Sequence, residues 1–131
     1  MIAIIDYGVG NLFSLRSSLT HLGLEAVVTA DAQTIRKADR LILPGVGAFG
    51  DAMDKLSATG LVPVIREQAA QKPLLGICLG MQIMVMEFAR GVLGYADANS
   101  SEFTPDGAHN VIALMADQQG NIPKGGTMRL G

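Results

Sequence analysis

The sequence has very little of the residues that build disulfides and metal sites. Of its 131 residues only one is cysteine and two are histidine. A single cysteine can form neither an internal disulfide nor a cysteine-based zinc site, and two separated histidines add no ligand cluster. We therefore expect neither a metal nor a cofactor.

Strong charge and long apolar runs are also missing. The net charge is −2 with no basic run, which argues against a nucleic-acid partner. No apolar stretch approaches the length of a transmembrane helix, and the start, MIAIIDYGVG, lacks the pattern of a signal peptide. We therefore expect no membrane partner and a cytoplasmic location. The length and a hydrophobic content of 49% predict one globular domain over residues 1–131.

Short apolar runs alternate with helical patterns along the chain. The runs that predict strands are residues 2–5, 25–29, 40–43 and 74–77. The patterns that predict helices are residues 12–22, 51–58, 61–70 and 81–93, and residues 31–37 predict a short helix or a turn. Asn11 can cap the first of these helices. This alternation predicts an α/β fold with a doubly wound, mostly parallel sheet. After Gly94 the sequence is polar and turn-rich, with one more apolar run at 111–115 and a last predicted strand at 125–131.

A glycine-rich turn follows the third predicted strand. Gly45–Gly50 fits G-x-G-x-x-G between a strand and a helix, which is typical of dinucleotide sites. The motif follows the third strand and not the first, and the acidic residue about 20 positions on, Glu67, falls inside a predicted helix. Two other interpretations are a tight turn and a turn whose backbone N–H groups bind an oxyanion.

The only cysteine, Cys78, stands between Gly76 and Gly80 in the stretch LLGICLGMQ. This spacing, after a predicted strand and before a predicted helix, has the pattern of a nucleophile elbow, in which the nucleophile sits at a sharp bend in a strained conformation. The start of a helix favours negative charge, and the N–H of Leu79 would point at an oxyanion. A buried structural cysteine is the alternative.

At these residues the sequence resembles the class I (triad) glutamine amidotransferases. Residues 1–82 resemble the glutaminase subunit of imidazole glycerol phosphate synthase, of histidine biosynthesis, through IAIIDYGVGNLFSL, ADRLILPGVGAFGDAM and LLGICLGMQ. Residues 75–131 resemble the glutaminase domain of CTP synthase through GICLGMQ, MEFARGVLGYADANSSEF and GGTMRLG. The resemblance implies a flavodoxin-like amidotransferase domain that is incomplete at its C-terminus. It also implies a chimeric chain joined near residues 75–82.

The resemblance implies a role for the cysteine and for the glycine-rich turn. Cys78 would attack the side-chain amide carbon of L-glutamine, giving a glutamyl thioester and ammonia. Backbone N–H groups of Val46 or Gly47, together with that of Leu79, would form the oxyanion hole.

The resemblance also implies substrate and partner contacts. Gly45 and Gln82 would line the glutamine pocket, and Glu102 would bind the α-amino group. Asn11 lies where the histidine-pathway subunit faces its cyclase barrel. The alternatives are an exposed helix residue for Gln82, a solvated loop charge for Glu102 and a simple helix cap for Asn11.

One part of the family pattern is absent from these residues. Both families complete the triad with a His-x-Glu or similar pair downstream of the cysteine, whereas His109 is followed by Asn110-Val111. The resemblance places His109 in a non-catalytic loop, with a surrogate base as the alternative, and His21 at a helix end or the surface. We therefore expect weak glutamine binding and slow acylation with impaired turnover.

Missing strands would leave a sheet edge uncovered, so we expect self-association through it. Two rival hypotheses are a non-catalytic α/β chain of composite or engineered origin and a flavodoxin-like nucleotide-binding module. A glutaminase of the CTP synthase type is a further alternative.

Overall fold

The computed structural model describes residues 1–46, 49–101 and 103–113. The chain divides into two compact units, Met1–Met81 and Gln82–Gly131. Within the described ranges, no helix has the length and apolar character needed to cross a membrane.

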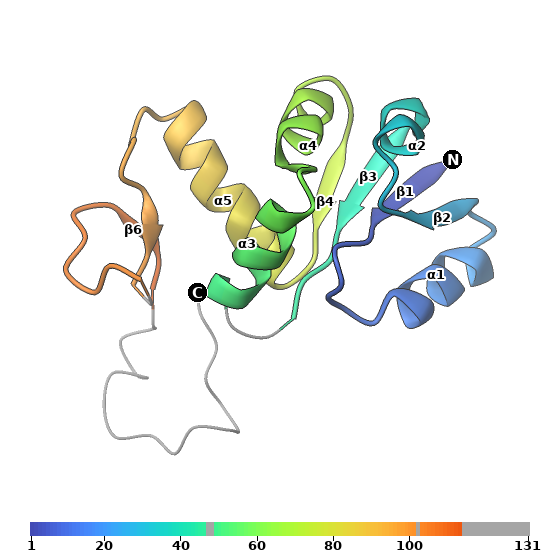
Figure 1. Ribbon diagram of the computed structural model, residues 1–131, viewed down its shortest axis with the longest axis horizontal. Coiled ribbons are helices and arrows are strands. Elements are labelled where there is room, and N and C mark those ends of the chain that lie inside the picture. Colours follow the sequence, from blue (N-terminus) through green and yellow to red (C-terminus); the bar gives the residue numbers. More distant parts are fainter. Residues whose placement is uncertain (47–48, 102, 114–131) are drawn as a thin grey trace, which may run out of the picture. The chain divides into compact units, whose positions relative to one another are not determined.

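The first unit is built on a four-stranded parallel sheet in the order β2-β1-β3-β4 (Figure 1). Its strands are β1 (Ile2–Ile5), β2 (Ala26–Thr29), β3 (Arg40–Leu43) and β4 (Leu74–Gly76). All four residues of β1 are buried, as expected of a β-branched strand that is covered on both faces. The predicted parallel α/β architecture is confirmed, and the strand bounds differ from the prediction by at most one residue.

The helices are α1 (Leu12–His21), α2 (Ala32–Lys37), α3 (Phe49–Ala58), α4 (Val62–Ala69) and α5 (Leu79–Gly91). Two of the predicted starts were wrong, since α3 and α5 each begin two residues earlier than the pattern indicated. Leu22 is the last residue of the first predicted helix, 12–22. It lies just beyond α1 and is 70% exposed, because the chain turns away there toward Gly23, which has a φ of 73°.

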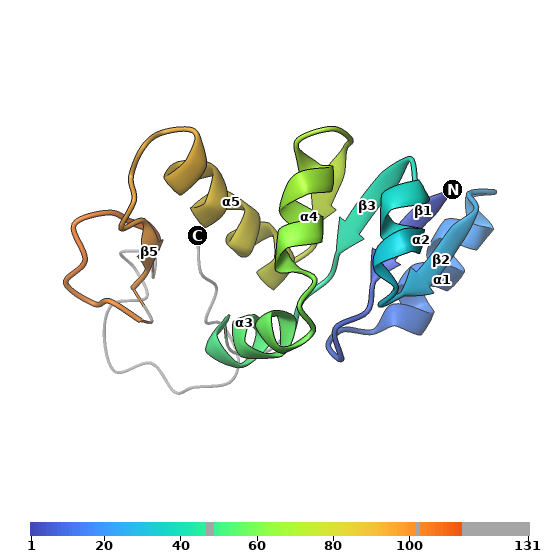
Figure 2. The same ribbon diagram turned by 45° about the horizontal axis from the view of Figure 1, so that its top comes forward.

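The two faces of the sheet are covered by different helices (Figure 2). Successive side chains of a strand point to opposite faces, so Ile2 and Ile4 share one face. Apolar side chains of α1 pack on this face, against a cluster that also includes Ile42. The connection from β2 to β3 passes over the opposite face and carries α2, which contacts α4 there.

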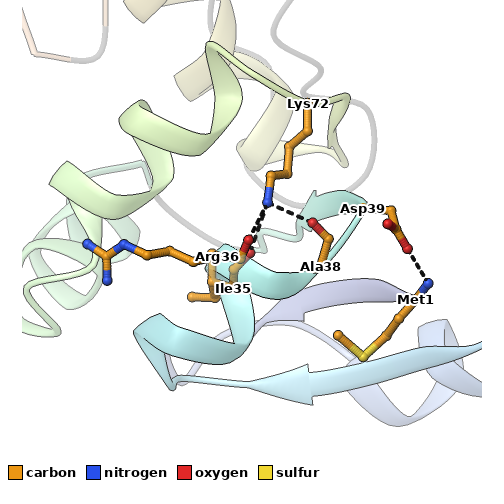
Figure 3. A network of polar contacts seen from close by, with 6 residues as sticks. All are labelled: Met1, Ile35, Arg36, Ala38, Asp39 and Lys72. Carbon is orange, nitrogen blue, oxygen red and sulfur yellow. Dashed lines mark hydrogen bonds and ion pairs between the residues drawn. The ribbon is translucent and has the colours of Figure 1, made fainter.

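Side chains bind the free backbone groups at the start of α1 and at the end of α2. Asn11 caps α1, as predicted, by accepting a hydrogen bond from the Ser14 backbone N–H at 3.1 Å. At the C-terminal end of α2, the Lys72 ammonium donates to the carbonyls of Arg36 at 2.8 Å and Ala38 at 2.6 Å (Figure 3). A cation there complements the negative end of α2 and satisfies carbonyls that the helix leaves unpaired.

The described part of the second unit contains most of α5 and two short parallel strands, β5 (Asn99–Ser100) and β6 (Asn110–Ile112). Strand β5 was not predicted, because its two residues are polar and stand in a turn-rich stretch. The guanidinium of Arg90 on α5 donates to the Ala98 carbonyl at 2.8 Å and so fastens the start of β5 to the helix. The apolar run 111–115 begins within β6, whereas its last two residues, 114 and 115, lie outside the described residues, as does the predicted strand at 125–131.

Candidate active site

Cys78 occupies the single bend between β4 and α5. Its φ is 54°, and it is the only non-glycine residue with a positive φ in the part of the chain that the structure describes. A side chain in this left-handed conformation costs about 1–2 kcal/mol, so other contacts must hold it. The thiol is exposed at the start of α5. The strained turn that the sequence pattern predicts is therefore present, and the alternative of a buried cysteine is wrong.

Two glycines allow the chain to pass close to this bend. A β-carbon on Gly80 would overlap with the Leu43 carbonyl oxygen at the end of β3. A β-carbon on Gly45 would lie 2.5 Å from that of Leu79 and 2.7 Å from the Gly80 nitrogen. Side chains at these two positions would force the turn after β3 away from α5. The glycines thus bring the Pro44–Val46 turn into direct contact with the residues that follow Cys78.

The loop after β1 reaches the same edge of the sheet. The Tyr7 hydroxyl, on a side chain that is only 4% exposed, donates to the Pro44 carbonyl at 2.5 Å. Gly10, with a φ of 99°, passes so close to Pro44 that a β-carbon would lie 3.3 Å from the proline β-carbon. Three loops therefore meet at the carboxyl ends of β1, β3 and β4, which is where open α/β sheets carry their sites.

Tyr7 interacts electrostatically with Cys78. Burial raises the pKa of Tyr7 above its ordinary value, and the charge of Cys78 raises it further. The hydroxyl therefore keeps its proton and remains a donor at neutral pH. Sequence reasoning missed Tyr7; the signal available was an aromatic residue in the turn directly after the first strand.

Backbone donors lie beside the thiol. Gly80 N–H bonds to the Ile77 carbonyl at 3.1 Å, and Met81 N–H bonds to the Cys78 carbonyl at 2.9 Å. Leu79 is the first residue of α5, and the first N–H groups of a helix have no acceptor within the helix. Val46 is 50% exposed on the facing turn. Gly47, the other predicted oxyanion residue, lies outside the described residues.

Gln82, one helical turn beyond Cys78, is buried. It is only 8% exposed, and its side-chain oxygen Oε1 has no hydrogen-bond partner among the described residues. The alternative of an exposed helix residue is therefore wrong. A buried amide oxygen without a donor is costly, which makes Gln82 a candidate for contact with a ligand.

The remaining predicted residues lie elsewhere or outside the described ranges. Asn11 is exposed at the start of α1 and His21 is exposed at its end, as expected for a cap and a helix-end residue. In the second unit, His109 Nδ1 lies 2.7 Å from Asp97 Oδ1, and the ring stacks on Tyr95 with centroids 4.4 Å apart. Glu102 is outside the described residues. Across the described ranges, no group of three or more acidic, histidine or cysteine side chains could hold a metal ion.

A parallel α/β sheet with a strained, exposed cysteine at a strand-to-helix bend belongs to the class of folds that carry a nucleophile elbow. The family model of the class-I glutamine amidotransferases matches residues 3–131. The chain therefore belongs to the class I glutamine amidotransferase family.

The chain is similar to curated subunits of one enzyme. It is 51% identical over 84 residues to imidazole glycerol phosphate synthase subunit HisH of Exiguobacterium sibiricum, covering 64% of this chain and 43% of that protein. It is 42% identical over 108 residues to imidazole glycerol phosphate synthase subunit HisH 2 of Methanococcus maripaludis, and this match covers 79% of this chain and 54% of that protein. The chain thus spans about half the length of the curated relatives it matches.

One solved structure is similar over almost the whole chain. It is the glutaminase domain of Trypanosoma brucei CTPS with bound acivicin, which matches with a TM-score of 0.65 and 25% sequence identity. The match covers 92% of this chain and 52% of the other.

Proposed function

We propose that this chain carries the acylation half of a glutaminase, with L-glutamine as substrate and Cys78 as nucleophile. The Cys78 sulfur attacks the side-chain amide carbon, the carbon–nitrogen bond breaks, and the thiol proton leaves with the nitrogen as ammonia. The product is a glutamyl thioester, which water then hydrolyses to glutamate. The observation that carries the proposal is the left-handed, exposed Cys78 at the start of α5.

The neighbouring groups have matching roles in this proposal. Backbone N–H groups of Leu79 and of Val46 or Gly47 hold the oxyanion that forms during attack. The packing of Gly45 on Leu79, which leaves no room for a β-carbon, supports this role for the turn. The same packing explains the glycine-rich motif without a dinucleotide.

Two further residues are proposed to bind the substrate. The unpaired Oε1 of the buried Gln82 supports a place in the glutamine pocket. Glu102 is proposed to bind the substrate's α-amino group through charge-assisted hydrogen bonds.

These 131 residues contain no His-x-Glu pair after Cys78, and His109 Nδ1 is already paired with Asp97. We propose that the chain acylates slowly and turns over poorly, because no oriented base activates water for the second step. The chain mixed with glutamine should release at most about one ammonia per cysteine before a very slow phase.

Rapid quenching followed by intact mass measurement tests this proposal. The glutamyl adduct should appear in the wild-type chain and be absent from Cys78→Ala. An ordinary steady-state glutaminase rate would contradict the impairment. No burst and no adduct would favour the second candidate, a non-catalytic α/β chain.

A synthase partner is proposed from the names of the relatives, which are subunits of imidazole glycerol phosphate synthase. We infer that the start of α1 faces the cyclase barrel of that enzyme. Asn11 is exposed there, and Phe13 beside it is 81% exposed, which is unusual for a large apolar side chain.

Phe13→Ser should abolish capture by a cyclase subunit in a pull-down. Leu22→Ser is the matched control, because Leu22 lies just beyond the other end of α1 and is 70% exposed. Equal capture of both variants would reject this surface.

We also propose a composite chain, with a histidine-pathway half joined to a CTP-synthase-like half near residues 75–82. The boundary between the two compact units, after Met81, supports this proposal. Self-association is proposed separately, through the edge of β4, which is the last strand of the sheet order in the described ranges. Light scattering tests it, and a monomer at high concentration would contradict it.

A further inference from the structure

Tyr7 has no role in the proposed chemistry so far, although it links two of the three loops at the site. It comes from the loop after β1, and its hydroxyl donates to the carbonyl of Pro44, 37 residues further along the chain. Both residues are buried. The carbonyl of Pro44 belongs to the same peptide unit as the N–H of Gly45, so this hydrogen bond fixes the rotation of the peptide with which the turn begins.

The first two residues of the turn, Pro44 and Gly45, are closely packed. Gly45 is packed against Leu79 and Gly80, and Pro44 lies against Gly10. Proline also fixes its own φ near −65°. Rotation of the Pro44–Gly45 peptide would change the direction of the N–H groups that follow, beginning with Val46.

We propose that Tyr7 is a positioning residue for the Pro44–Val46 turn, which we call the oxyanion turn. Its buried hydroxyl holds the Pro44 carbonyl so that the N–H groups that follow, beginning with that of Val46, face Cys78. This inference rests on the proposed function. Tyr7 acts through Pro44 and need not touch the substrate. The hydroxyl remains a donor at the pH of the reaction, because burial and the charge of Cys78 both raise the pKa of Tyr7.

The variant Tyr7→Phe removes the hydroxyl and keeps the ring. Two reagents report separately on the thiol and on the oxyanion turn. Iodoacetamide needs only an accessible thiol, whereas a glutamine-shaped diazoketone also needs the substrate pocket and the oxyanion hole. Because each chain has one cysteine, intact mass assigns the label without ambiguity. Tyr95→Phe is the matched control, since Tyr95 is the only other tyrosine and lies in the second unit.

In Tyr7→Phe the diazoketone rate should fall by on the order of ten- to a hundredfold, while the iodoacetamide rate stays at the wild-type value. Tyr95→Phe should leave both rates unchanged. A purely structural role for Tyr7 would change both rates together and leave their ratio alone, so an unchanged ratio overturns the inference. If glutamine does not protect the wild-type chain from the diazoketone, the proposed function itself fails, and this inference falls with it.

A measurement on the wild-type chain covers the case in which Tyr7→Phe does not fold. A buried hydroxyl that donates to a carbonyl should exchange its proton slowly with water, so the Tyr7 hydroxyl proton should be visible by NMR at neutral pH. A Tyr7 hydroxyl proton that exchanges as fast as that of Tyr95 would overturn the inference.

Discussion

Gly80 and Leu43 approach so closely that a β-carbon on Gly80 would overlap with the Leu43 carbonyl oxygen and lie 2.8 Å from the carbonyl carbon. The same carbonyl oxygen accepts a hydrogen bond from Ile77 N–H at 3.0 Å. One peptide group at the end of β3 therefore holds both sides of the bend that carries Cys78. The left-handed Cys78 lies between the two backbone segments that this carbonyl contacts.

Substitution of Gly80 by alanine should therefore damage the elbow. Gly80→Ala forces backbone atoms apart, and we expect it to lower the free energy of unfolding by more than about 2 kcal/mol. Gly91→Ala is the matched control, because Gly91 belongs to the same helix and nothing lies within 4 Å of its added β-carbon. Urea unfolding followed by circular dichroism measures both. Equal stability of the two variants would show that the packing at Gly80 is not tight.

The strain at Cys78 should be measurable as stability gained when it is relieved. Glycine adopts a φ of 54° without steric cost, whereas alanine does not. We expect Cys78→Gly to be about 1 kcal/mol more stable than Cys78→Ala, with both variants unable to take up the label. Thermal unfolding of the two variants side by side gives the difference. A less stable Cys78→Gly would argue that the residue is not held in the left-handed region.

Local sequence pattern predicted the sheet well because its strands are short, apolar and β-branched, and because the intervening patterns have helical spacing. The start of α5 was placed at Met81, two residues late, because Leu79-Gly80 has the composition of a turn. The helix begins directly after Cys78 since Gly80 lets it pass the Leu43 carbonyl, which is a tertiary contact. Tyr7 was missed for the same reason, because its partner Pro44 is distant in the sequence.

Tyr7 should also make stability depend on alkaline pH. Tyrosine in the unfolded chain ionises near pH 10, whereas burial and the Cys78 charge raise the pKa of Tyr7 in the folded chain. Above about pH 10 the unfolded chain has lost the Tyr7 proton while the folded chain still holds it. The free energy of unfolding therefore falls as pH rises from about 10 through the folded pKa.

Urea unfolding between about pH 9 and pH 11 tests this dependence. The loss of stability across that range should be smaller in Tyr7→Phe than in the wild-type chain and in Tyr95→Phe. The same slope in all three chains would contradict the assignment.

Lys72 should stabilise the first unit through the end of α2. Its ammonium donates to the carbonyls of Arg36 and Ala38, which methionine cannot do. Lys72→Met should lower the free energy of unfolding by about 1–2 kcal/mol. Lys55→Met, on the exposed surface of α3, is the control for loss of one positive charge. Chemical denaturation compares the two, and a Lys72→Met chain as stable as Lys55→Met would count against the network in Figure 3.

The most direct test of the account is the labelling of Cys78 in the wild-type chain. The rate of modification by a glutamine-shaped diazoketone is compared with that of iodoacetamide, with and without excess glutamine, by intact mass. We predict that the diazoketone labels Cys78 faster than iodoacetamide does and that glutamine blocks this labelling, because Cys78 is exposed at a formed elbow. Slow labelling by both reagents, unaffected by glutamine, would mean that the chain keeps the amidotransferase fold without a working glutamine site.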